Sequence, residues 1–156
     1  MWLLRRRNGR PFYHYSIAEK IAYYQDKLNS SESTKERERA TRNLYRLNRI
    51  ANGKETFGKV FMVKDIEFNP DTNSHKSRRV VCIGLKDGNM KVIPVRRNNK
   101  MVALSKFDGN RGININHTYN VSLDKIYEKR NFKKTSNDYL TLHEKLELYR
   151  KLNGNR

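Results

Sequence analysis

The chain has 156 residues, with 34 Lys and Arg against 16 Asp and Glu, and a formal net charge of +18. This length suits one domain of ordinary size, and a mean hydropathy of -0.97 predicts a modest core. No apolar run approaches the roughly 18 residues of a membrane span. The apolar residues 1–4 precede three arginines, which is the reverse of the order in a signal peptide. The charge favours nucleic acid as the partner, with an acidic protein or a membrane surface as alternatives.

The first 56 residues are predicted to form an extension made of a basic arm and a helical hairpin. Four arginines make the arm and three aromatic residues follow it: Arg5, Arg6, Arg7 and Arg10, then Phe12, Tyr13 and Tyr15. Such a mixture suits phosphate contact and base stacking; the alternative is that the aromatic rings pack onto the domain. Ser16-x-x-Glu19 and Ser33-x-x-Glu36 are two capping boxes, and Asn52-Gly53 is a helix stop. Two antiparallel helices are therefore expected, the second ending near Ala51.

The second predicted helix carries two opposed stripes. The apolar stripe consists of Ala40, Leu44, Leu47 and Ala51. The basic stripe consists of Lys35, Arg39, Arg42, Arg46 and Arg49. At 100° per residue the two sets lie on opposite faces. A charged outer face is ordinary for a surface helix, but arginine suits phosphate geometry. We predict that the four arginines add to a nucleic-acid surface.

Residues 57–156 are predicted to form a small SH3-like antiparallel β-barrel with a C-terminal helix, which makes the chain α+β. Strands are expected at 59–66, 78–85, 90–95 and within 119–127, with a tight turn at Asp87-Gly88. The second strand is a nearly continuous apolar run and should be central. It contains the lone cysteine, Cys82, which is expected to be buried, and this cysteine usage fits the cytoplasm. The last helix, 136–152, should pack on the barrel through Leu142, Leu146, Tyr149 and Leu152.

Paired arginines stand at two strand ends that should meet at one rim of the sheet: Arg78, Arg79, Arg96 and Arg97. RNA carries its own nucleophile, the 2′-hydroxyl, so its cleavage needs only a base, an acid and cations that stabilise the transition state. Arg78, Arg79 and Arg96 are candidates for the cations, and His75 for the proton carrier. Lys76, Arg97 and Arg111 are predicted to bind RNA beside them. The scattered histidines lack metal-ligand spacing, and no phosphate-binding loop is present, so neither metal nor cofactor is expected.

Residues 57–134 resemble the PemK/MazF family of toxin endoribonucleases. Four segments carry the resemblance, in family order: Gly58-Lys59-Val60-Phe61-Met62-Val63, Arg79-Val80-Val81-Cys82-Ile83, Val92-Ile93-Pro94-Val95-Arg96 and Asp124-Lys125-Ile126-Tyr127-Glu128-Lys129-Arg130. Val80 stands where the family has proline, and Arg96 where it has the catalytic threonine. The helical hairpin is additional to the family barrel.

The resemblance implies a metal-independent endoribonuclease that cuts single-stranded RNA, with Arg79 on the scissile phosphate. It also implies a homodimer and an acidic antitoxin partner that occupies the RNA groove. The threonine role does not carry over to Arg96. The rival hypotheses are therefore a non-catalytic RNA- or DNA-binding module on the same barrel, and an interaction protein that docks on an acidic partner.

Overall fold

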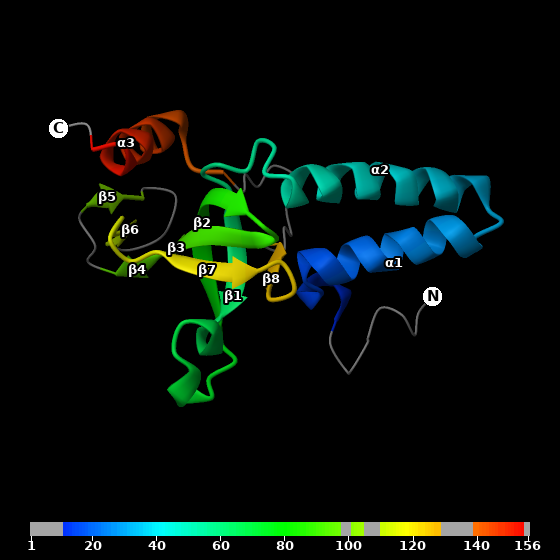
Figure 1. Ribbon diagram of the computed structural model, residues 1–156, viewed down its shortest axis with the longest axis horizontal. Helices are drawn as coiled ribbons and strands as arrows, with labels where there is room; N and C mark the ends of the chain where they lie inside the picture. The colour runs from blue at the N-terminus through cyan, green and yellow to red at the C-terminus, as the bar shows by residue number, and fades with distance from the viewer. Residues whose placement is uncertain (1–10, 98–100, 105–109, 129–138, 155–156) are drawn as a thin grey trace.

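A computed structural model describes residues 11–97, 101–104, 110–128 and 139–154. The chain is α+β: an N-terminal helix pair, a five-stranded antiparallel half-barrel, a small three-stranded sheet and a C-terminal helix (Figure 1). The hairpin projects from one side of the half-barrel, while the small sheet and the last helix lie at the other side (Figure 1). The arm arginines 5–10 lie outside the described residues.

The helical hairpin consists of α1, Ile17–Ser30, and α2, Thr34–Ala51. The capping box at Ser16 is complete, as predicted. The second predicted capping box, at Ser33, forms only in half. The backbone N–H of Glu36 donates to the hydroxyl of Ser33, but the carboxylate of Glu36 accepts a hydrogen bond from the hydroxyl of Ser31 at 2.6 Å. The chain ends α2 at Asn52 and turns at Gly53, whose φ of 75° suits glycine.

The apolar side of the hairpin packs on the half-barrel. The buried side chains of α2 are Ala40, Leu44, Leu47 and Ile50. The last buried position of the helix is Ile50, where the sequence predicted Ala51. The aromatic residues before α1 also pack inward: Tyr15 is 1% exposed, and Phe12 contacts the ring of Tyr23 with centroids 4.8 Å apart. The packing alternative for these rings is therefore correct.

The half-barrel has the strand order β7-β3-β2-β1-β8. Its strands are β1 Val60–Lys64, β2 Ser77–Lys86, β3 Asn89–Pro94, β7 Tyr119–Ser122 and β8 Ile126–Glu128. The apolar strand β2 is central, as predicted. Asp87 and Gly88 have φ values of 54° and 78°, which gives the β2–β3 hairpin the twist of its strands.

The sheet is buried on both faces because alternate side chains enter two separate clusters. Phe61, Val80 and Met90 pack with the hairpin in the first cluster. Val60 and Val81 belong to the second, which includes residues of the small sheet and of the last helix. The small sheet is formed by β4 Arg96–Arg97, β6 Arg111–Ile113 and β5 Val102–Ala103, in that order.

Two further sequence predictions need correction. The first strand ends at Lys64, not 66, because a 3₁₀ turn, η3 Asp65–Glu67, follows it, and a second one, η4 Pro70–Thr72, shapes the connection to β2. The last helix, α3 Leu142–Leu152, begins at the capping box of Thr141, and its inward side chains are Glu144 and Leu148. The face predicted to pack on the barrel instead points outward, except for the half-buried Leu152: Leu142, Leu146 and Tyr149 are exposed.

None of the helices in the described ranges combines the length and the apolar character that crossing a bilayer requires.

Candidate nucleic-acid interface

The four rim arginines stand at one end of the half-barrel. Val80 lies opposite Pro94 in the β2–β3 pair. The backbone N–H of Val95 then donates to the carbonyl of Arg79 at 3.0 Å, which brings β4 alongside the start of β2. The strands thus gather the arginines as the sequence suggests, because both pairs sit where their strands leave the apolar sheet.

The arginines do not form one cluster, because neighbours along a strand point to opposite faces. Arg78 shares the face of Val80, which belongs to the hairpin-side cluster, and Arg79 shares that of Val81 on the other side. Arg96 lies on the same side as Arg78, since its guanidinium sits 5.9 Å from the ring centre of Phe68, a residue packed on the hairpin-side cluster. The proposed catalytic cations are therefore divided between two faces.

Arg78 is held by an acidic partner. Its Nε donates to Oδ1 of Asp65 at 2.6 Å, and the hydroxyl of Ser74 donates to Oδ2 at 3.2 Å. The hydrogen bond from Arg78 lowers the pKa of the Asp65 carboxyl, although partial burial opposes it. This pair ties η3 to the start of β2, so Arg78 has a structural role in addition to any contact with RNA.

Arg96 stands over the ring of Phe68, which packs against a second aromatic ring. The rings of Phe68 and Tyr119 lie with centroids 4.8 Å apart. Both side chains are half-buried, whereas Arg96 is exposed. An exposed guanidinium beside aromatic surface offers a phosphate contact and a stacking platform for a base.

Arg97 and Arg111 are direct cross-strand neighbours in the β4–β6 pair. Side chains that face each other in this way lie on one side of the sheet, and two like charges there repel. The side chain of Arg97 is exposed and that of Arg111 half-buried. The small sheet therefore places two arginines side by side immediately after Arg96, an arrangement that suits contact with phosphate.

His75 lies in a pocket of about 400 Å³ at the β1–β8 edge. The other lining residues are His14, Ser16, Glu19, Lys64, Ile66, Glu67, Asp124, Lys125 and Tyr127. Met62 of β1 lies opposite Arg79 of β2 on one side and opposite Tyr127 of β8 on the other. Cross-strand partners point to the same face, so Arg79 and Tyr127 share the face opposite Arg78 and Arg96. Three carboxylates balance the two lysines, so the pocket does not select anions by charge alone. Lys76 is exposed next to it.

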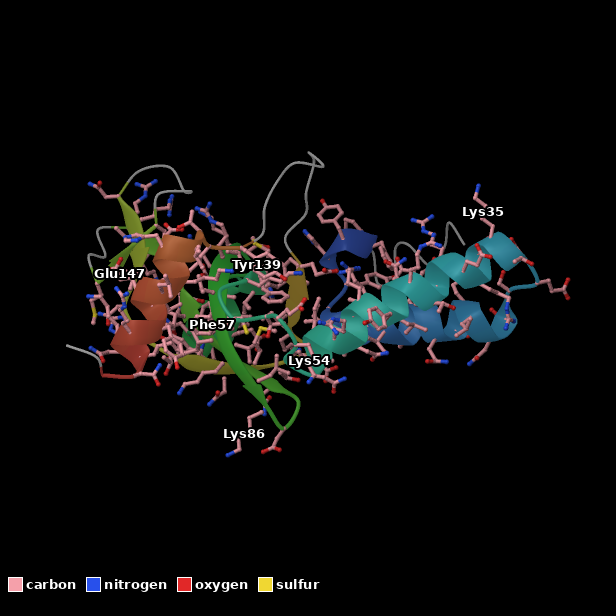
Figure 2. All side chains as sticks on the ribbon, turned by 90° about the horizontal axis from the view of Figure 1, so that it is seen from above. Lys35, Lys54, Phe57, Lys86, Tyr139 and Glu147 are labelled. Atoms are coloured by element: carbon pink, nitrogen blue, oxygen red, sulfur yellow. The ribbon has the colours of Figure 1, made fainter. Side chains whose placement is uncertain are left out.

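The arginines of α2 lie away from the rim, because the hairpin and the small sheet stand at opposite sides of the half-barrel (Figure 1). Arg46 forms an ion pair with Glu128, and Arg49 binds Glu55 at 3.0 Å. Arg39 and Arg42 are exposed on the outer face of the helix, and Lys35 marks its distal end (Figure 2). Their contact with RNA stays a prediction.

Sequence reasoning missed the aromatic pair and most of the pocket. Phe68 and Tyr119 are far apart in the chain. They meet because Phe68 follows the 3₁₀ turn after β1 and Tyr119 begins β7, which pairs with β3. His14 reaches Tyr127 with ring centroids 5.3 Å apart because the segment before α1 packs on β8. Across the described ranges, no three His, Cys, Asp or Glu side chains gather in a way that could hold a metal ion.

Comparison with protein-family models, curated proteins and solved structures finds no match to this chain.

Proposed function

We propose that this protein binds single-stranded RNA at the arginine end of its half-barrel. The observation that carries the proposal is Arg96 over the ring of Phe68, which packs against Tyr119, with Arg97 next in the strand. Aromatic faces stack unpaired bases, and arginines contact the phosphates between them. The net charge of +18 supplies the long-range attraction that such binding needs.

A double variant, Arg96→Gln with Arg97→Gln, tests this surface. Each lost contact between an arginine and a phosphate should weaken binding about tenfold. The matched control is Lys86→Gln with Lys91→Gln, which removes the same charge from two exposed lysines of the β2–β3 hairpin (Figure 2 labels Lys86). Fluorescence anisotropy with a labelled single-stranded RNA gives the dissociation constants. Equal weakening by both pairs would show that binding follows net charge and would reject the rim.

Salt titration tests how far the interface extends. An RNA strand that crosses from the face of Arg96 to the face of Arg79 would meet five cations: Lys76, Arg79, Arg96, Arg97 and Arg111. Five such contacts would give a slope of about -3.5 in log K against log salt for a single strand, or about 100-fold weaker binding over a fourfold salt rise. Replacing Arg39 and Arg42 by alanine should leave this slope unchanged if RNA stays at the rim. A slope that is shallower by about 1.4 in this variant than in the wild type would show that RNA also reaches α2.

Metal-independent cleavage of RNA is the second candidate function. It is favoured by the pocket in which His14 and His75 occur together, with Arg79 on the same face of the sheet. Two imidazoles can serve as the base and the acid that attack by the 2′-hydroxyl requires. On this proposal the half-barrel is an SH3-like, PemK/MazF-like barrel with Arg79 on the phosphate, and a homodimer and an acidic antitoxin are its proposed partners.

A further inference from the structure

The outer face of α3 is apolar although it is exposed. Leu142, Leu146 and Tyr149 expose 71%, 45% and 59% of their surface. Their spacing of four and three residues places them in one line along the helix. The opposite side of α3 already packs on the protein through Leu148, which is fully buried. The helix therefore has a second apolar face that its own packing does not explain.

The apolar face of α3 continues into an open hollow of about 660 Å³. The hollow is lined by Glu55, Phe57, Tyr139, Leu140, Thr141, Leu142 and Lys145. Phe57 meets Tyr149 edge to face, with ring centroids 6.4 Å apart. Figure 2 shows Phe57 and Tyr139 beside α3. Helix face and hollow together form one continuous surface, the α3 surface, defined by Phe57, Tyr139, Leu142, Leu146 and Tyr149.

The edges of the α3 surface are basic. The nitrogens of Lys59 and Lys145 lie 5.4 Å and 5.3 Å from the ring centre of Tyr139. The stem of Lys145 crosses Gly58 so closely that a Cβ there would stand 2.6 Å from its Cγ. Arg150, exposed, flanks the apolar line on its other side by helical geometry.

Within the described ranges, the nearby carboxylates do not cancel this charge. Glu55, at the hollow, is bound by Arg49 at 3.0 Å. Glu144 is buried and caps the start of α3. By helical geometry, Glu147 lies at a larger angle around the helix axis from the apolar line than Arg150.

We propose that the α3 surface docks an acidic amphipathic helix of a partner protein. Such a helix would place its apolar side chains on the line of Leu142, Leu146 and Tyr149, as in other helix-in-groove complexes. Its carboxylates would meet Lys59, Lys145 and Arg150. A second copy of this chain fits poorly, because an antiparallel pairing of two α3 helices brings basic edges against basic edges. The inference does not depend on RNA binding.

Three synthetic peptides of roughly four helical turns test the docking. The first has leucines at the i, i+4 and i+7 spacing and glutamates beside them; the second has lysines in place of the glutamates; the third rearranges the first so that no apolar face forms. Calorimetry should show that the first binds at least about tenfold more tightly than either of the others. Equal binding of the first two would overturn the charge complementarity, and equal binding of the first and third would overturn the apolar docking.

Point variants test whether the peptide binds at α3. Leu146→Asp should weaken the first peptide about tenfold or more, because it puts a charge into the apolar contact. Tyr45→Asp is the matched control, since Tyr45 is 67% exposed on α2, and should have no effect. Equal loss in both variants would contradict the assignment to α3.

Two further outcomes would overturn the proposal. Sedimentation that shows a dimer in the wild type and a monomer in Leu146→Asp would assign the surface to a second copy. Protection of Leu146→Cys from maleimide in the isolated monomer would show that other residues of this chain cover it. The buried Cys82 provides the low background that this labelling needs.

Discussion

Replacing Glu128 by glutamine is expected to lower the free energy of unfolding by about 3 kcal/mol. Glu128 stands in β8 and forms two ion pairs. Its Oε1 binds Lys20 of α1 at 3.1 Å, and its Oε2 binds Arg46 of α2. The side chains of Lys20 and Glu128 are only 9% and 14% exposed. The variant leaves the ammonium of Lys20 buried without a balancing charge, which is more costly than the loss of a surface pair. Thermal unfolding should show a decrease in Tm of roughly 10 °C.

Two further variants separate this ion pair from general effects of charge. Glu55→Gln removes the exposed carboxylate that Arg49 binds and should leave Tm unchanged. Lys20→Met combined with Glu128→Leu removes both buried charges and should recover most of the stability, while Arg46 can turn to water. If the double variant is as unstable as Glu128→Gln, the loss comes from packing at β8 and the ion pair is not its cause.

The same carboxylate predicts a dependence of stability on pH. Burial alone would raise the pKa of Glu128, but the positive charges of Lys20 and Arg46 outweigh it and lower the pKa. A carboxyl whose folded pKa lies below its unfolded value, about 4.3, stabilises the fold above that value. This contribution is lost as pH falls through the folded pKa. The wild type should therefore lose more stability than Glu128→Gln on acidification below about pH 4.

The elements that sequence predicted correctly are those with local signals. The capping box at Ser16 and the Asp87-Gly88 turn each depend on residues three or fewer positions apart, so the chain shows them directly. The central place of β2 followed from its apolar run. The failure at α3 depends on long-range contacts: helical periodicity identified an apolar face of this helix, but its other side, with Leu148, packs on the protein.

In the candidate site, too, the sequence predicted the local features but not the contacts between distant residues. The sequence placed the rim arginines at two strand ends, and the register brings those ends together. It did not separate Arg78 from Arg79 by face, although alternation along a strand requires this separation. The partners of these residues could not be predicted, because Asp65 and Phe68 acquire their positions from the 3₁₀ turn after β1.

If the protein cuts RNA, Arg79→Ala should reduce the rate of cleavage about 10²- to 10³-fold, the usual effect of removing a group that stabilises developing negative charge. In the proposed reaction the 2′-oxygen attacks phosphorus and the bond to the 5′-oxygen breaks. A base accepts the 2′-hydroxyl proton and an acid protonates the leaving oxygen, which gives a 2′,3′-cyclic phosphate and a 5′-hydroxyl end. Of the candidate arginines Arg78, Arg79 and Arg96, it is Arg79 that shares its face of the sheet with the pocket of His14 and His75.

The measurement is cleavage of a mixed single-stranded RNA in EDTA, with product ends identified by mass. Arg79→Lys keeps the charge but loses two-point contact with phosphate oxygens, so it should restore only part of the rate. His75→Gln should remove one limb of the pH–rate profile if His75 transfers a proton, and Lys86→Gln should cut like the wild type. RNA that the wild type binds but leaves intact would reject the cleavage proposal and leave RNA binding as the function. Cutting that persists undiminished in Arg79→Ala would place the chemistry elsewhere in the chain.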